Sequence, residues 1–130
     1  MQSKEEVFAG VRDALVEALA VEEDEVTPQA LLEGDLGAES IDLLDIVYRL
    51  EKTFDIKIEQ GELVPSDIVN DTTGRYAVDS KLTPEGLAEI KKRLPGANFT
   101  VFESNPMIAN LTTVLTVQDL CNLVEQKLRQ

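Results

Sequence analysis

The sequence has no histidine, no tryptophan and a single cysteine among its 130 residues. The chain alone therefore cannot assemble a Cys/His zinc site, a histidine-based catalytic triad or an internal disulfide. Cys121 lies among Leu120, Leu123 and Val124. We therefore expect it to be a buried helix thiol, and we assign it no chemistry.

Basic residues are also scarce, with 12 Lys and Arg against 25 Asp and Glu, for a net charge of -13. This charge repels nucleic-acid phosphates and anionic lipid surfaces, so nucleic-acid binding is not expected. Residues 1–60 hold sixteen acidic and five basic residues (net -11), whereas residues 61–115 hold seven and five (net -2). Partners of the first half should therefore be basic.

No apolar run approaches the ~20 residues of a membrane span, and the first residues lack the basic start and apolar stretch of a signal peptide. These absences favour a cytoplasmic protein. The hydrophobic content of 43% is enough for one modest core at this length. We expect residues 1–130 to form a single domain and the protein to be a monomer.

Three segments show helical periodicity. Ser3 and Glu6 have the spacing of a capping box before an apolar pattern that continues to Leu19, and Thr116 with Asp119 resembles the start of a closing helix. Between them, a helix opening at Ser40 carries one continuous apolar stripe, formed by Leu43, Ile46, Val47, Leu50 and Phe54. We predict a long loop over residues 21–37, with one short helical turn around residues 28–32.

Most of the turn-forming residues lie in residues 62–114, whose apolar content is too high for a disordered linker. Thr83-Pro84-Glu85 predicts a helix start, and Pro95-Gly96 predicts its end. Residues 76–78 and 99–102 are candidates for short extended pieces. This part should be an ordered insertion.

The segment from Asp35 to Asp45 is the most informative, because it places Ser40 where a loop becomes a helix. A phosphate ester on Ser40 would face free backbone N–H groups and the positive end of the helix dipole. Gly37 allows a tight backbone approach at this junction. Taken alone, Ser40 would also fit an ordinary N-cap residue.

The same helix has a second apolar row at i, i+3 and i+7, separate from the stripe. A small bundle buries one side of a helix, so this row should be partly exposed. Carboxylates flank it, which is typical of a docking surface for a basic partner. The row is Ile41, Leu44 and Tyr48, and its flanking residues are Glu39, Asp42, Asp45 and Glu51. In the alternative, the insertion covers Ile41 or Tyr48.

Asp-Leu-Gly-Ala-Glu-Ser-Ile-Asp, residues 35–42, resembles the Asp-x-Gly-x-Asp-Ser-Leu-Asp signature of acyl carrier proteins, with Ser40 on the modified serine. Residues 26–32, 50–58 and 116–120 also resemble the family in its order. The resemblance implies an all-α, acyl-carrier-like four-helix bundle. Its core would be residues 1–61 and 115–130, with a mostly helical insertion at about 62–114 that lengthens the usual connection by roughly 45 residues.

By resemblance, Ser40 would carry a covalent 4'-phosphopantetheine arm, transferred from coenzyme A by a phosphopantetheinyl transferase. The arm would hold acyl groups as thioesters for acyl-transferring and synthase enzymes with basic docking patches, in fatty-acid, polyketide or related lipid biosynthesis. The chain would be a carrier and not an enzyme. Ile46, Val47 and Leu50 would line an acyl pocket in the core.

The insertion could extend that pocket, cover it or present a second partner surface. The cluster Lys91-Lys92-Arg93 favours a partner surface, although a solvated helix end would look the same. Two rival functions remain open: an unmodified carrier-fold module that binds basic partners through its acidic second helix, and a small acid-base hydrolase using Asp35 and Asp42.

Overall fold

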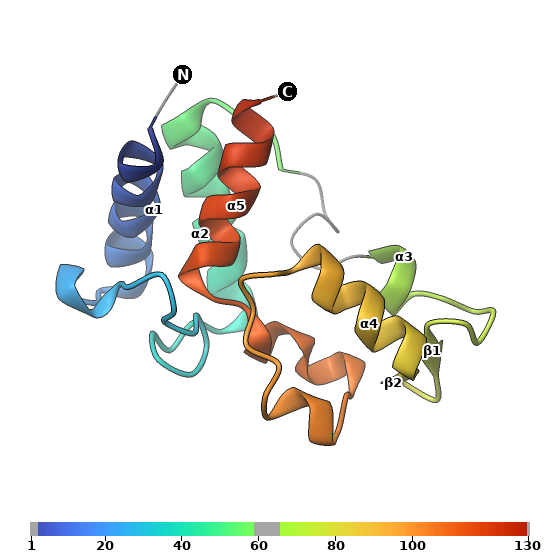
Figure 1. Ribbon diagram of the computed structural model, residues 1–130. Helices are drawn as coiled ribbons and strands as arrows, with labels where there is room; N and C mark the ends of the chain where they lie inside the picture. Colours follow the sequence, from blue (N-terminus) through green and yellow to red (C-terminus); the bar gives the residue numbers. More distant parts are fainter. Residues whose placement is uncertain (1–2, 59–65, 130) are drawn as a thin grey trace.

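The computed structural model describes residues 3–58 and 66–129. Three helices form a bundle, in which α1 packs against both α2 and α5 and runs antiparallel to them (Figure 1). Their bounds are Lys4–Leu19 for α1, Ser40–Phe54 for α2 and Val117–Leu128 for α5. The described part of the chain is predominantly helical, which confirms the predicted all-α class.

The remaining elements are short, apart from α4, and most of them lie beside the end of the bundle where α2 begins (Figure 1). The α-helices are α3 at Ser66–Val69 and α4 at Pro84–Arg93. Ala77–Val78 (β1) pairs antiparallel with Lys81–Leu82 (β2). The described residues also form 3₁₀ helices: η1 at Glu23–Glu25, η2 at Phe102–Ser104 and η3 at Ile108–Val114.

The helix starts follow the sequence signals. Ser3 Oγ accepts the Glu6 N–H at 3.2 Å, and the Glu6 side chain accepts in return, as a capping box requires. Thr83 Oγ1 accepts the Gly86 N–H at 3.0 Å, with Pro84 in the first turn of α4. These contacts satisfy N–H groups that a helix leaves without internal partners, so the chain fixes its helix starts locally.

The stripe predicted on α2 faces the core. Ile46 and Leu50 are fully buried, Phe54 is nearly so, and Leu43 and Val47 pack against the core from its edge. The same buried cluster includes Leu15 of α1, Val124 of α5 and insertion residues such as Leu82, Ile90 and Phe102. The segment predicted to be an insertion therefore packs into the same core as the bundle.

One local prediction is wrong, and a second is met only in part. Residues 99–102 are not extended: they form a turn that leads into η2, because the rings of Phe99 and Phe102, three residues apart, pack edge to face with centroids 6.1 Å apart. The short helix expected at residues 28–32 is reduced to one hydrogen-bonded turn, in which the Ala30 N–H donates to the Thr27 carbonyl at 3.1 Å. Leu31 instead forms an isolated bridge with Thr116, and the short helix lies earlier, at η1.

The predicted start of the insertion at residue 62 lies outside the described residues. Within residues 3–58 and 66–129, no helix combines the length and the apolar character needed to cross a membrane.

Candidate functional site

The loop before α2 is held against the start of α5. The Leu32 N–H donates to the Leu115 carbonyl at 3.0 Å, and the Val117 N–H donates to the Ala30 carbonyl at 3.0 Å. Within the loop, the Ala38 N–H donates to the Leu32 carbonyl at 2.8 Å. Leu32, Leu36 and Ala38 are buried. The loop therefore delivers the chain to α2 in a fixed position.

Gly37 takes the left-handed conformation, with φ of +74°. A β-carbon built on it would have no atom within 4 Å. Glycine is therefore suited to this position by its backbone angle, since other L residues adopt it at a cost. The sequence predicted that another part of the backbone packs closely against Gly37, and the structure shows no such contact among the described residues.

Ser40 is the first residue of α2, and Glu39 holds the N-cap position. The alternative in which Ser40 itself caps the helix is therefore wrong. The Asp42 carboxylate accepts the Glu39 N–H at 2.8 Å, which fixes the start of the helix. A group attached at this first position would lie beside the unpaired N–H groups and the positive dipole end, which favour a phosphate.

The second apolar row of α2 is exposed, as predicted. The exposed fractions are 71% for Ile41, 68% for Leu44 and 55% for Tyr48. Residues 66–114, the described part of the predicted insertion, leave all three side chains exposed, so the alternative of a helix buried on both sides is wrong. Large apolar side chains aligned on one exposed helix face are typical of a protein interaction surface.

The carboxylates that flank the row differ in what they bind. Glu39 is exposed, whereas Asp42 is half-buried and tied to the helix start. Asp45 pairs with Arg49 at 3.2 Å. Glu51 accepts the Ile58 N–H at 2.9 Å, which holds the segment after α2. The acidic rim therefore also organises its own helix.

The basic side chains of α2 lie on the same surface. Arg49 bridges Asp45 and Glu17 of α1, with its Nη1 atom 2.9 Å from Glu17 Oε2. The Lys52 ammonium lies 5.1 Å from the centre of the Tyr48 ring. Glu17 was not among the predicted site residues, because it is 32 positions from Arg49 and no local pattern links the two.

The predicted acyl-pocket residues are part of the packed core. Ile46 and Leu50 have no exposed surface, and Val47 is partly buried against the same cluster. They lie on the side of α2 opposite the exposed row, so the helix separates the apolar core from an exposed apolar face.

Residues 9–73 match the family model described as "Phosphopantetheine attachment site". The chain belongs to the acyl carrier protein family. It is 41% identical over 71 residues to the acyl carrier protein of Thermotoga maritima, which covers 55% of this chain and 88% of the relative. It is also 41% identical over 61 residues to the acyl carrier protein of Petrotoga mobilis, with 47% and 72% covered.

Proteins of this family are carriers and not enzymes, and their cofactor is 4'-phosphopantetheine. The residues around Ser40 fit this group in one respect that the structure shows: the first position of a long helix favours a phosphate. When bound, the arm supplies the thiol that holds an acyl group as a thioester.

The carboxylates considered for a hydrolase serve the backbone of this acyl carrier protein. Asp35 accepts the Leu31 N–H at 2.8 Å, and Asp42 accepts the Glu39 N–H at 2.8 Å. Each therefore stabilises a turn beside Ser40. These contacts give both residues a structural role in the loop before α2 and at the start of the helix.

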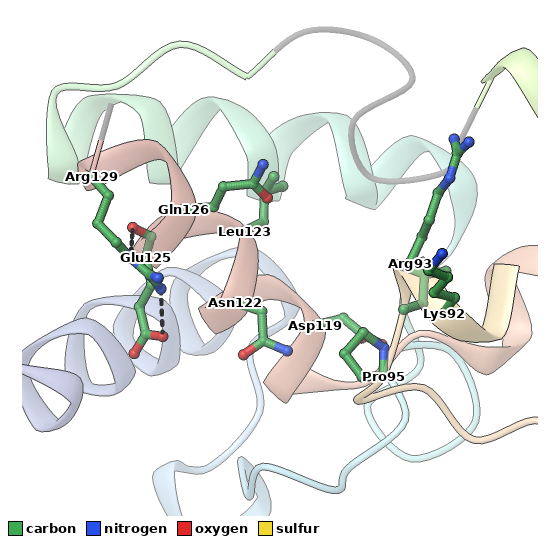
Figure 2. Close-up of a pocket in the computed structure, with 10 residues that line it drawn as sticks. Lys92, Arg93, Pro95, Asp119, Asn122, Leu123, Glu125, Gln126 and Arg129 are labelled. Carbon is green, nitrogen blue, oxygen red and sulfur yellow. Dashed lines mark hydrogen bonds and ion pairs between the residues drawn. The ribbon is translucent and has the colours of Figure 1, made fainter. Parts of the chain in front are cut away.

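The basic cluster of α4 forms ion pairs with acidic side chains of the same chain. Arg93 pairs with Asp67 at 2.7 Å and with Glu89, and Lys91 pairs with Glu103. Lys92 and Arg93 line a hollow of about 510 Å³ between the end of α4 and α5, where Figure 2 shows them across from the α5 side chains. Two of the three cations thus tie α4 to neighbouring segments, while all three side chains stay exposed.

Proposed function

We propose that this acyl carrier protein carries its 4'-phosphopantetheine arm on Ser40 and serves fatty-acid, polyketide or related lipid biosynthesis. The observation that carries the proposal is the position of Ser40 as the first residue of α2, at the end of a loop fixed to α5. The helix start favours the phosphate, and the exposed row beside it offers a surface for the enzyme that attaches the arm.

The partners in this proposal are a phosphopantetheinyl transferase and acyl-handling enzymes with basic docking patches. Ile41, Leu44 and Tyr48 would provide apolar contact, and Glu39, with the other rim carboxylates, would steer the encounter. Lys52, which lies over the Tyr48 ring, places positive charge at the far end of the same face, whereas Arg49 is paired with Asp45 and Glu17. A matching partner would therefore combine basic groups near Ser40 with an acidic or neutral group further along.

We also propose that residues 1–130 fold as one domain, with an insertion at about 62–114 added to a carrier core. The shared buried cluster supports this, since bundle residues and insertion residues pack into it together. Unfolding of the bundle and of α4 should then occur in one cooperative transition.

Intact-mass measurement after incubation with coenzyme A and a broad-specificity phosphopantetheinyl transferase tests the attachment site. We expect a gain of one phosphopantetheinyl group, abolished by Ser40→Ala and retained by Ser80→Ala, a serine on the turn between β1 and β2. No gain in the native chain would favour an unmodified interaction module. A gain that persists in Ser40→Ala would place the arm on another residue.

A further inference from the structure

A groove of about 710 Å³ lies between the loop that precedes α2 and the insertion. Its walls come from chain segments far apart in sequence, which the bonds between residues 30–32 and the start of α5 bring together. The residues that line it are Leu31, Glu33, Gly34, Asn98, Thr100, Val101, Phe102, Ser104, Asn105, Asn110, Thr113 and Val114.

The groove has an apolar floor and a neutral polar rim. Phe102 and Val114 are buried, whereas Val101 at the edge is 84% exposed, the most exposed of the large apolar side chains in the described chain. Most of the other lining residues are amides and hydroxyls. Glu33 is the one charged side chain among the described residues that line the groove, although the whole chain has a net charge of -13.

The groove is within reach of Ser40. Gly34 precedes Ser40 by six positions, and six extended residues span at most about 20 Å. The turns at residues 32–36 shorten this path further, and the start of α2 and the insertion lie at the same end of the bundle (Figure 1). A pantetheine arm has roughly the reach of a five-residue extended chain, about 17 Å, so its far end can meet the groove.

We propose that this groove receives the acyl chain carried on Ser40, with the hydrocarbon against Phe102 and Val101 and the amides of the arm along the Asn and Thr rim. The inference rests on the proposed attachment of the arm to Ser40. It assigns to the predicted insertion one wall of a ligand site outside the helical core, because nine of the lining residues lie in residues 98–114 and only Leu31, Glu33 and Gly34 belong to the loop before α2.

The chemistry of the lining favours this occupant over a protein partner. A basic protein partner is attracted by clustered carboxylates, and such a cluster lies on α2. The groove has a single carboxylate, that of Glu33, among its described lining residues. An arm with neutral amides and an apolar acyl group matches neutral amides and an apolar floor. A short acyl group would gain little from the groove, and a longer one would gain with each methylene that leaves water.

Thioester protection tests the proposal on the full chain. The arm is loaded with an acetyl or an octanoyl group, and cleavage by hydroxylamine is followed by mass spectrometry and compared with the two coenzyme A thioesters. We expect the octanoyl thioester to be protected and the acetyl thioester to react freely. Val101→Asp should increase octanoyl cleavage on the order of fourfold for each methylene returned to water.

Val78→Asp is the matched control, because Val78 is also an exposed valine, at 50%, and lies on β1 outside the groove. Protection that is unchanged in Val101→Asp, or lost equally in Val78→Asp, would overturn the groove assignment in favour of burial in the core or of a general effect of charge. The mass of the loaded sample, compared with that of Ser40→Ala treated in the same way, reports attachment at Ser40 separately. Failure to load would overturn both proposals, whereas loading without protection would overturn only this one.

Discussion

Gly86, in the first turn of α4, lies against the backbone carbonyl of Tyr76, so that a β-carbon at Gly86 would stand 2.8 Å from the Tyr76 carbonyl carbon. The same carbonyl accepts the Thr83 N–H at 2.9 Å. Backbone thus packs on backbone where the β1–β2 hairpin meets α4, and neither side can move without losing a bond. This contact joins two elements of the insertion.

Gly86→Ala should lower the free energy of unfolding by about 1–3 kcal/mol, the usual cost of forcing an extra methyl group into a packed site. Urea denaturation followed by circular dichroism measures it. Gly34→Ala is the control: its β-carbon would meet only the Leu31 side chain, at 3.4 Å, so its stability should change little. Equal effects of the two substitutions would show that the contact with Tyr76 is not restrictive.

The parts of the fold that the sequence predicted depend on signals within a few residues. Capping pairs such as Ser3 and Glu6 and the apolar period of α2 fixed the long helices. The missed parts depend on contacts that leave no helical or strand period in the sequence, such as the bridge between Leu31 and Thr116, which are 85 positions apart. Aromatic residues favour strands by propensity, yet Phe99 and Phe102 pack together across a turn.

In the candidate site, too, some features were predictable from local sequence and others were not. Ser40 and the exposed row at Ile41, Leu44 and Tyr48 follow from one motif and one helical period. The ion pair of Arg49 with Glu17 and the groove beside Val101 do not, because each joins segments that only the folded chain brings together.

Leu44→Ala should impair docking without affecting the fold. Leu44 is 68% exposed, so its removal should leave the unfolding free energy within about 0.5 kcal/mol of the native value. Loss of apolar contact at an interface should lower kcat/KM for arm transfer several-fold, mainly through KM. Val78→Ala, which removes another exposed aliphatic side chain, should leave kcat/KM unchanged. Equal kinetics for both variants would exclude this face as the transferase surface.

Asp119 should make the protein less stable as pH rises above 3.8. Burial raises the pKa of this carboxyl from its usual 3.8, against opposing hydrogen bonds from Thr116. The folded state therefore holds the proton more tightly than the unfolded state, so this group's contribution is most favourable below pH 3.8 and falls as pH rises through the folded pKa. In the native chain, the Asp119 carboxylate accepts a hydrogen bond from the Thr116 N–H at 2.9 Å. An asparagine at this position can accept the same hydrogen bond but carries no charge at any pH.

Unfolding of Asp119→Asn and of the native chain, measured from pH 3.8 to pH 7, tests this effect. The stability of the variant relative to the native chain should increase across the lower part of that range and then stay level. Asp71 provides a contrast, because its hydrogen bonds, first among them that from the Thr73 side chain, lower its pKa. Its contribution is lost as pH falls below 3.8. A difference between Asp119→Asn and the native chain that does not vary with pH would show that burial does not perturb this carboxyl.

Cys121 should stay unreactive while a thiol on the arm reacts. Its side chain is buried in α5, and burial, with a smaller effect of the Glu125 charge, raises the pKa of the thiol from 9.0 to about 11. Two pKa units leave about a hundredfold less thiolate at a given pH, and the thiolate is the nucleophile.

Iodoacetamide alkylation at pH 8 tests this prediction on protein that carries the phosphopantetheine arm with its thiol free. This form should be alkylated once, at the arm, whereas Ser40→Ala should be alkylated only when it is unfolded in urea. Cys121→Ala separates the two thiols, since its loaded form should react at the native rate. Rapid alkylation of folded Ser40→Ala would contradict the burial of Cys121 and would mean that the carrier has a second thiol open to acyl transfer.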